Sequence, residues 1–235
     1  MGNLALRDRA AILLAGKDAP RVLSAPKAQE YWASQGLNVS PAFAVRLFKL
    51  WSATGELKPL RRGIFLNMRA SPKPDVAEAA QHIRSGAIVS LQTVLGRSGA
   101  HNNPTPWITC VVPQTTQGRR GATGEVLAGN TLFSFSGIAP YLVPHKNDVW
   151  YRDSFQPYAK VPTATPEKAL LDMIYLGSHT NSKVALPAIV DIDWDALDGE
   201  RLERLAEYMH LTEAYTEYRK GTPLVIGPFV KKPGI

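Results

Sequence analysis

The sequence has little cysteine and no long apolar run, and each shortage excludes a class of protein. Cys110 is the single cysteine among 235 residues, which excludes internal disulfides and clusters of thiolate metal ligands. No apolar run approaches the roughly 18 residues that cross a bilayer, and charged residues interrupt the amino terminus, where a signal peptide would be apolar. We therefore expect a cytoplasmic protein that is neither secreted nor membrane-spanning, with Cys110 buried as an inert thiol.

Motifs for catalysis and ligand binding are also missing. The chain contains no Gly-x-Ser-x-Gly turn and no phosphate loop ending in Gly-Lys-Ser or Gly-Lys-Thr. Its histidines are scattered, and no two have the i, i+4 spacing of a helical metal site. The alternating carboxylates Asp191, Asp193 and Asp195 lack the glycine and terminal glutamate of a calcium loop, so we interpret them as a solvated acidic turn. We expect no enzyme activity, no metal and no cofactor.

The positive charge is concentrated in the first third of the chain. Residues 1–70 contain 11 Lys/Arg and 4 Asp/Glu, a balance equal to the net charge of +7, whereas residues 71–235 contain 16 of each sign. A local basic excess favours a polyanionic partner, nucleic acid before a membrane surface, because clustered cations displace counterions from phosphates. A basic surface that only faces water is the alternative.

The first 70 residues are predicted to contain three helices. Apolar residues recur at helical spacing over Leu4–Ala15, and that helix ends at Gly16. A second helix follows Ser24, carries Trp32 on its inner side and ends at Gly36. Both are amphipathic, so each requires a partner that covers its apolar side.

The third helix has the clearest signals for its start and end. Ser40 is a suitable N-cap, Pro41 fits the first helical position, and Gly55 ends the segment. One stripe is apolar and is expected to face the core: Phe43, Leu47, Leu50 and Trp51. The other is small at its start and basic in its middle, as entry into a DNA major groove requires: Ala42, Arg46, Lys49 and Ala53. A surface helix with two solvated cations is the alternative for this segment alone.

A basic hairpin is predicted directly after the third helix. The apolar stretches Leu57–Leu60 and Ile64–Leu66 flank a turn that contains two arginines and Gly63. Three helices and such a hairpin are typical of a winged helix-turn-helix, whose third helix reads base edges while the wing contacts phosphates or the minor groove. We therefore predict binding to double-stranded DNA, with these candidate residues: Ser40, Ala42, Arg46, Lys49, Lys58, Arg61 and Arg62.

The chain is predicted to have two domains and an α+β fold. Pro72 and Pro74 remove backbone donors and favour extended neighbours, so we place a boundary there. Residues 1–70 are the predicted winged helix-turn-helix domain, and residues 71–235 are a larger mixed α/β domain whose carboxyl-terminal part is helical.

The second domain combines predicted helices with short strands. Helices are expected over Asp75–Arg84, from Leu91 to about Arg97 with Ser90 as the cap, over Pro166–Gly177 after the cap Thr165, and twice more between Leu202 and Tyr218. Strands are expected over Ala87–Ser90, Trp107–Val112, Thr131–Ser136 and Asp148–Arg152.

A Gly-Arg-Arg-Gly loop at Gly118–Gly121 resembles the Gly-x-x-Gly loop of KH modules, which bind single strands. It follows a predicted strand and lacks the flanking helices of those modules. We interpret it as a flexible basic loop, and its contact with nucleic acid stays open.

Four segments, in order over roughly residues 20–180, resemble the abortive-infection AbiEi antitoxin family of type IV toxin–antitoxin systems. They are Leu60–Phe65, Gly86–Ser90, Thr93–Leu95 and Thr165–Asp172. The most specific feature is the pair formed by the arginine-glycine wing and the distant Thr-Pro-Glu-Lys-Ala-Leu-Leu-Asp helix. The sequence departs from the family in two places. After the Ser-x-x-Thr segment the family usually has a small residue and then a His-Gly pair, whereas here Gly96–Gly99 intervenes before Ala100 and His101. The carboxyl-terminal region is also short.

The resemblance implies a transcriptional repressor that acts on its own operon and in phage defence. Such a protein binds operator DNA, usually as inverted repeats, and matching positions for the contacts are Arg46, Lys49, Arg61 and Arg62. The second domain would be the antitoxin-like domain, which antagonises a nucleotidyltransferase-like toxin encoded beside it without forming a stable complex.

An alternative function is a nucleic-acid-processing enzyme, in which a nuclease-like second domain is targeted by the winged helix. Such a domain requires clustered carboxylates that bind divalent cations. The candidates are Asp148, Asp153 and Glu167, and their spacing fits no catalytic motif.

Overall fold

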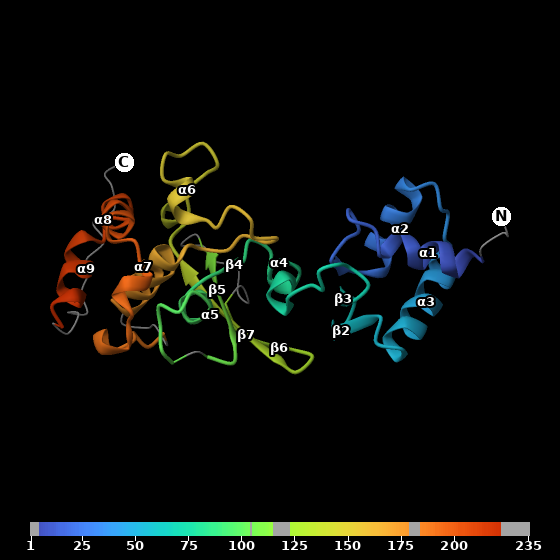
Figure 1. Cartoon of the computed structure of the whole chain (residues 1–235), viewed down its shortest axis with the longest axis horizontal. Helices are drawn as coiled ribbons and strands as arrows, with labels where there is room; N and C mark the ends of the chain where they lie inside the picture. Colours follow the sequence, from blue (N-terminus) through green and yellow to red (C-terminus); the bar gives the residue numbers. More distant parts are fainter. Residues whose placement is uncertain (1–4, 104, 115–122, 179–183, 222–235) are drawn as a thin grey trace. The chain divides into compact units, whose positions relative to one another are not determined.

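The computed structural model describes residues 5–103, 105–114, 123–178 and 184–221, which form two compact units (Figure 1). The amino-terminal unit comprises Met1–Ile83 together with Leu127–Asn130, and the carboxyl-terminal unit comprises Arg84–Val126 and Thr131–Ile235. The mixed α+β class expected from the sequence is confirmed. The boundary at residue 70 stays a prediction, and the compact units divide between residues 83 and 84.

The amino-terminal unit has the element order of a winged helix. Its elements are α1 (Leu6–Leu14), β1 (Val22–Leu23), α2 (Ala25–Ser34), α3 (Pro41–Ala53), β2 (Leu57–Arg61) and β3 (Ile64–Asn67), followed by a 3₁₀ turn (Val76–Ala79) and α4 (Ala80–Ile83). The three strands form an antiparallel sheet in the order β1-β3-β2. The three predicted helices and the hairpin are confirmed, whereas β1 was not predicted because two residues show no alternation.

Two tryptophans organise the core of this unit. Trp32 is fully buried, and its indole N–H donates to the carbonyl oxygen of Ala10 at 3.1 Å, which joins α2 to α1. Its ring meets that of Trp51 on α3 edge-on, with centroids 6.1 Å apart. Buried aromatic rings contribute large apolar area, and the indole N–H has the partner that its burial requires. The packing around Trp32 therefore fixes the positions of all three helices.

The carboxyl-terminal unit is built around a mixed four-stranded sheet and a buried helix. The strands of the sheet are β4 (Ile88–Val89), β5 (Ile108–Pro113), β6 (Gly124–Ala128) and β7 (Thr131–Ile138), in the order β4-β5-β7-β6. The last two residues of β6 are counted with the amino-terminal unit. The helices of the carboxyl-terminal unit are α5 (Gln92–Arg97), α6 (Tyr151–Ser154), α7 (Pro166–Gly177), α8 (Gly199–Tyr208) and α9 (Thr212–Arg219), with 3₁₀ turns at Pro140–Leu142, Ile189–Asp191 and Trp194–Ala196. Helix α7 contacts β7 as well as α8 and α9, and in Figure 1 it lies between the sheet and those two helices.

Two local predictions for this part of the chain are wrong, and a third is confirmed in part. Asp148–Arg152 is not a strand, because the Asp148 carboxylate accepts the backbone N–H of His145 and closes a turn that leads into α6. Ser90 does not cap α5; Leu91 occupies the N-cap position, at φ +60°, and the Ser90 hydroxyl bonds elsewhere. The helix expected over Asp75–Arg84 begins with a 3₁₀ turn and continues as α4.

Other features of the chain agree with expectation. Cys110 is buried on β5, and burial raises the pKa of its thiol to about 12. Asp193 and Asp195 are exposed in the acidic turn before α8. In the part of the chain that the structure describes, no helix is long and apolar enough to span a membrane. The Gly118–Gly121 loop lies outside the described residues.

Candidate nucleic-acid interface

Helix α3 separates an apolar inner face from a basic outer face. The Ser40 hydroxyl accepts the backbone N–H of Phe43 at 3.3 Å, so the predicted N-cap is present. Ala42, Arg46 and Lys49 are exposed, as the predicted outer stripe requires. Pro41–Ala53 contains no acidic residue, so nothing on α3 itself offsets the two cations.

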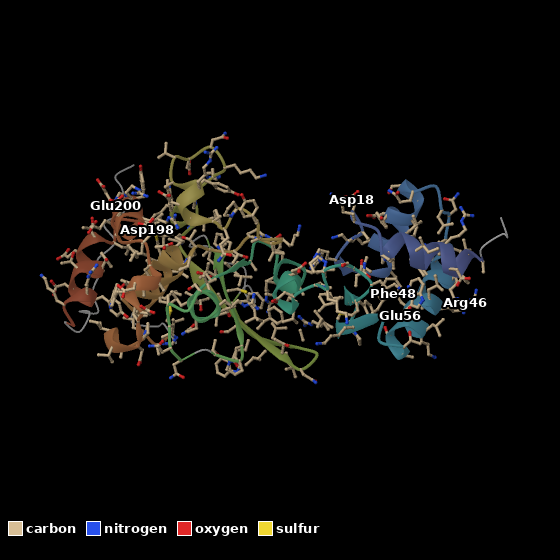
Figure 2. All side chains as sticks on the ribbon, viewed as in Figure 1. Asp18, Arg46, Phe48, Glu56, Asp198 and Glu200 are labelled. Carbon is tan, nitrogen blue, oxygen red and sulfur yellow. The ribbon has the colours of Figure 1, made fainter. Side chains whose placement is uncertain are left out.

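The inner face of α3 differs in part from the prediction. Leu50 is 43% exposed, whereas Ala44 and Phe48 complete the buried stripe with Leu47 and Trp51. The Phe48 ring packs edge-on against Phe65 of β3, with centroids 5.0 Å apart. Figure 2 shows Arg46 on the side of α3 opposite Phe48. The apolar contacts of the inner face of α3 therefore hold the helix so that its basic face points outward.

A ring contact positions the Arg46 side chain. Its guanidinium lies 5.6 Å from the centroid of the Phe43 ring, three residues earlier on the helix. Cation–π attraction favours this position, which directs the guanidinium towards the start of α3. In winged helix-turn-helix proteins that end of the recognition helix contacts base edges.

The β2–β3 hairpin exposes three more cations. Strand β2 has a register shift between Pro59 and Arg61, so Leu60 is buried while Lys58 and Arg61 are exposed. Arg62 lies in the turn, followed by Gly63 at φ +78°, a conformation that glycine adopts without steric cost. The bulge and the glycine together place cationic side chains outward at the tip of the wing.

Two other arginines of the amino-terminal unit are paired with carboxylates. Arg21 donates to the Glu78 carboxylate at 2.7 Å, which raises the pKa of Arg21, and Arg69 pairs with Glu56. Among the described residues, no salt bridge involves the following five cations: Arg46, Lys49, Lys58, Arg61 and Arg62. We call these five, with Ser40 and Ala42, the α3–wing surface. Arg9, Lys17, Lys27 and Lys73 of the same unit also form no salt bridge among the described residues, but only on α3 and the wing do five such cations belong to the helix and hairpin that the sequence singled out.

The candidate carboxylates of the enzyme alternative form salt bridges with arginines or hydrogen bonds within a turn. Arg201 approaches Glu167 at 3.3 Å and Asp153 at 3.8 Å, and Arg204 approaches Asp153 at 3.3 Å. The Asp148 carboxylate accepts the backbone N–H of His145 in the turn before α6. No group of three or more His, Cys, Asp or Glu side chains suited to a metal occurs within the described ranges.

A large cleft in the carboxyl-terminal unit does not contain these carboxylates either. It has a volume of about 830 Å³ and lies along the sheet, where Trp107, Thr109, Ser134 and Ser136 are among its lining residues. Glu125 is the one carboxylate among the described lining residues, and no histidine is present there. This lining offers hydroxyl groups and aromatic rings but no paired acid and base.

A buried polar network in this unit was missed by the sequence analysis. Ser90 donates to Asp172 at 2.7 Å, and Lys168 pairs with the same carboxylate from one helical turn earlier in α7. Lys168 is 3% exposed and Asp172 is 0% exposed. Burial raises the pKa of Asp172, which Lys168 and Ser90 partly oppose by stabilising the charged form. The i, i+4 spacing of Lys168 and Asp172 within an apolar helix was the available signal.

Comparison with known proteins bears on the fold alone. No protein-family model matches the chain, and no curated protein matches it in sequence. The fold is similar to that of the RV2827C protein from Mycobacterium tuberculosis, known from a crystal structure, with a TM-score of 0.51 and 18% identity. The match covers 93% of this chain and 78% of that one. At this identity the likeness shows a shared fold alone.

Proposed function

We propose that this protein is a DNA-binding transcriptional regulator of the kind represented by the AbiEi antitoxins. The observation that carries the proposal is the α3–wing surface, where five exposed cations without acidic partners lie on the recognition helix and wing of a winged-helix unit. Unpaired cations gain most from phosphates, because binding releases the counterions that surround the duplex. Arginines already held by Glu78 or Glu56 contribute less.

Each part of the surface has a role in the proposed complex. Arg46 is suited to bidentate hydrogen bonds with guanine O6 and N7 in the major groove, and the small Ala42 permits close approach of the helix. Lys49, Lys58 and the two arginines of the wing contact phosphates, which fixes the orientation of the protein on the duplex. The regulator then acts by occupying an operator, and two copies on an inverted repeat would double the contacts.

The antitoxin role depends on the resemblance to the AbiEi family. Two segments that carry the resemblance meet in the carboxyl-terminal unit, since Ser90 bonds Asp172 in the Thr-Pro-Glu-Lys-Ala-Leu-Leu-Asp helix. One hydrogen bond thus accounts for residues of both segments, which supports the proposed relation to the AbiEi family. The proposed antagonist is a nucleotidyltransferase-like toxin encoded next to this gene.

A reporter driven by the promoter of the gene's own operon tests the regulatory role. Expression of the protein should lower reporter output, and Arg46→Ala/Lys49→Ala should relieve that repression at equal protein level. Equal repression by the variant and the wild type would refute DNA recognition through α3.

Co-expression with the neighbouring gene product tests the antitoxin role. Growth should recover with the full chain, and no recovery would limit the proposal to regulation.

The nuclease alternative is less favoured because Arg201 and Arg204 neutralise Asp153 and Glu167. Incubation of the purified protein with plasmid and Mg²⁺ or Mn²⁺ separates the two functions. We expect intact plasmid, whereas cleavage lost in Asp153→Asn would favour the enzyme.

A further inference from the structure

Val45 is an exposed apolar residue in the middle of α3. Its side chain is 60% exposed, although valine is a weaker helix former than alanine and gains little from packing at this position. Neither helix propensity nor burial therefore accounts for a β-branched residue here. The position gains a purpose if a partner covers the side chain.

The neighbours of Val45 place it within the α3–wing surface. Ala42 lies about one turn before it and Lys49 one turn after it, while Arg46 follows directly. Residues three and four apart are neighbours on a helix surface, so Val45 lies between Ala42, which permits close approach of the helix, and Lys49, which is assigned to a phosphate. Its methyl groups project from the same outer side that bears the unpaired cations.

Leu50, the other large exposed apolar residue of α3, has a different environment. It lines a cleft of about 270 Å³ together with Arg7 and Ala11 of α1. Its exposed surface therefore borders the body of the unit, whereas Val45 does not line that cleft. Val45 is thus the apolar residue that the outer face presents to a partner.

We infer that Val45 packs against the C5 methyl group of a thymine in the major groove of the operator, close to a guanine read by Arg46. Thymine is the one base that presents a methyl group in this groove, and apolar side chains recognise it by contact. The inference rests on the proposed function and deepens it, because it names a base and the atom that is read.

Deoxyuridine provides the test, because it lacks only the thymine methyl group. Full-length wild-type protein first selects preferred duplexes from a random pool. Each thymine of the selected site is then replaced singly by deoxyuridine, and affinities are measured by fluorescence anisotropy for wild type, Val45→Ala and the control Ile12→Ala. Ile12 is an exposed aliphatic residue of α1, 58% exposed and outside the α3–wing surface. Circular dichroism melts verify that all three proteins fold.

One thymine should stand out. Its replacement by deoxyuridine should weaken wild-type and Ile12→Ala binding about fourfold, the effect of one buried methyl group, and should leave Val45→Ala unaffected. A deoxyuridine effect that persists in Val45→Ala, or no effect at any thymine, overturns the inference while the proposed regulator survives on its selected site. A pool that yields no preferred sequence overturns both.

Discussion

The hydroxyl group of Ser90 donates a 2.7 Å hydrogen bond to the carboxylate of Asp172, which lies 82 residues later in the chain. Lys168 completes the buried network by pairing with the same carboxylate. A buried charge is tolerated only when it is paired and hydrogen-bonded, so the turn after β4 and helix α7 depend on each other. This network joins two segments of the carboxyl-terminal unit through buried side chains.

Removing Lys168 should be costly. Lys168→Met leaves the Asp172 carboxylate buried without its counter-ion, and loss of one partner of a buried pair costs about 3–5 kcal/mol. The double variant Lys168→Met/Asp172→Leu should recover most of this loss, because no buried charge is left. Urea unfolding of the full chain measures both, and a single-variant loss below about 1 kcal/mol would contradict the network's role.

Arg21 separates stability from DNA binding within the amino-terminal unit. Arg21→Ala removes the guanidinium from a mostly buried Glu78 carboxylate and from the carbonyl oxygen of Pro72. We expect a loss of about 1–3 kcal/mol in the free energy of unfolding with unchanged affinity for duplex DNA in the folded protein. A clear drop in affinity at temperatures well below the melting transition would show that paired cations also contact DNA.

The cap of α3 should matter for both folding and binding. Ser40→Ala removes the acceptor of the Phe43 N–H and should cost about 0.5–2 kcal/mol, and fraying of the first turn should also weaken DNA binding. Ser24→Ala is the matched control, since it removes the equivalent cap of α2, where the hydroxyl accepts from Lys27. In thermal melts the two variants should lose similar stability, whereas in duplex titrations only Ser40→Ala should lose affinity. Equal losses of affinity would count against α3 as the helix that reads the DNA.

Cys110 should be unreactive until the protein unfolds. Burial raises the pKa of its thiol from 9.0 to about 12, so the thiolate is scarce in the folded state at pH 8. A thiol whose pKa is raised on folding contributes stability that is fully present below about pH 9 and is lost as pH rises towards 12. A thiol-specific reagent should react only along the urea transition, and Cys110→Ala should reduce the alkaline loss of stability. Rapid reaction of the native protein would refute this burial.

What the sequence predicts well is set by local chemistry. The Ser40 cap, the outer stripe through Ala42, Arg46 and Lys49, and the glycine turn of the hairpin each depend on residues within a few positions, and the structure contains all three. What it misses depends on distant partners. Serine is a common N-cap residue, but the Ser90 hydroxyl donates its hydrogen bond to Asp172.

A periodic pattern in the sequence also does not predict which residues of an element are exposed. Leu50 fits the apolar stripe of α3 as well as Phe48 does, yet only Phe48 meets a ring from β3. Strand β6 was not predicted at all, and its exposed residues alternate with the buried Val126 and Ala128. In both cases the deciding contact comes from another element.

The salt dependence of duplex binding tests the central claim most directly. Arg61→Ala/Arg62→Ala should lower the slope of log K against log salt concentration by about 0.9 for each lost phosphate contact. The control Arg9→Ala/Lys17→Ala removes the same charge from exposed positions outside the α3–wing surface and should leave the slope close to that of the wild type. Equal slopes for wild type and the wing variant would contradict DNA binding through this surface.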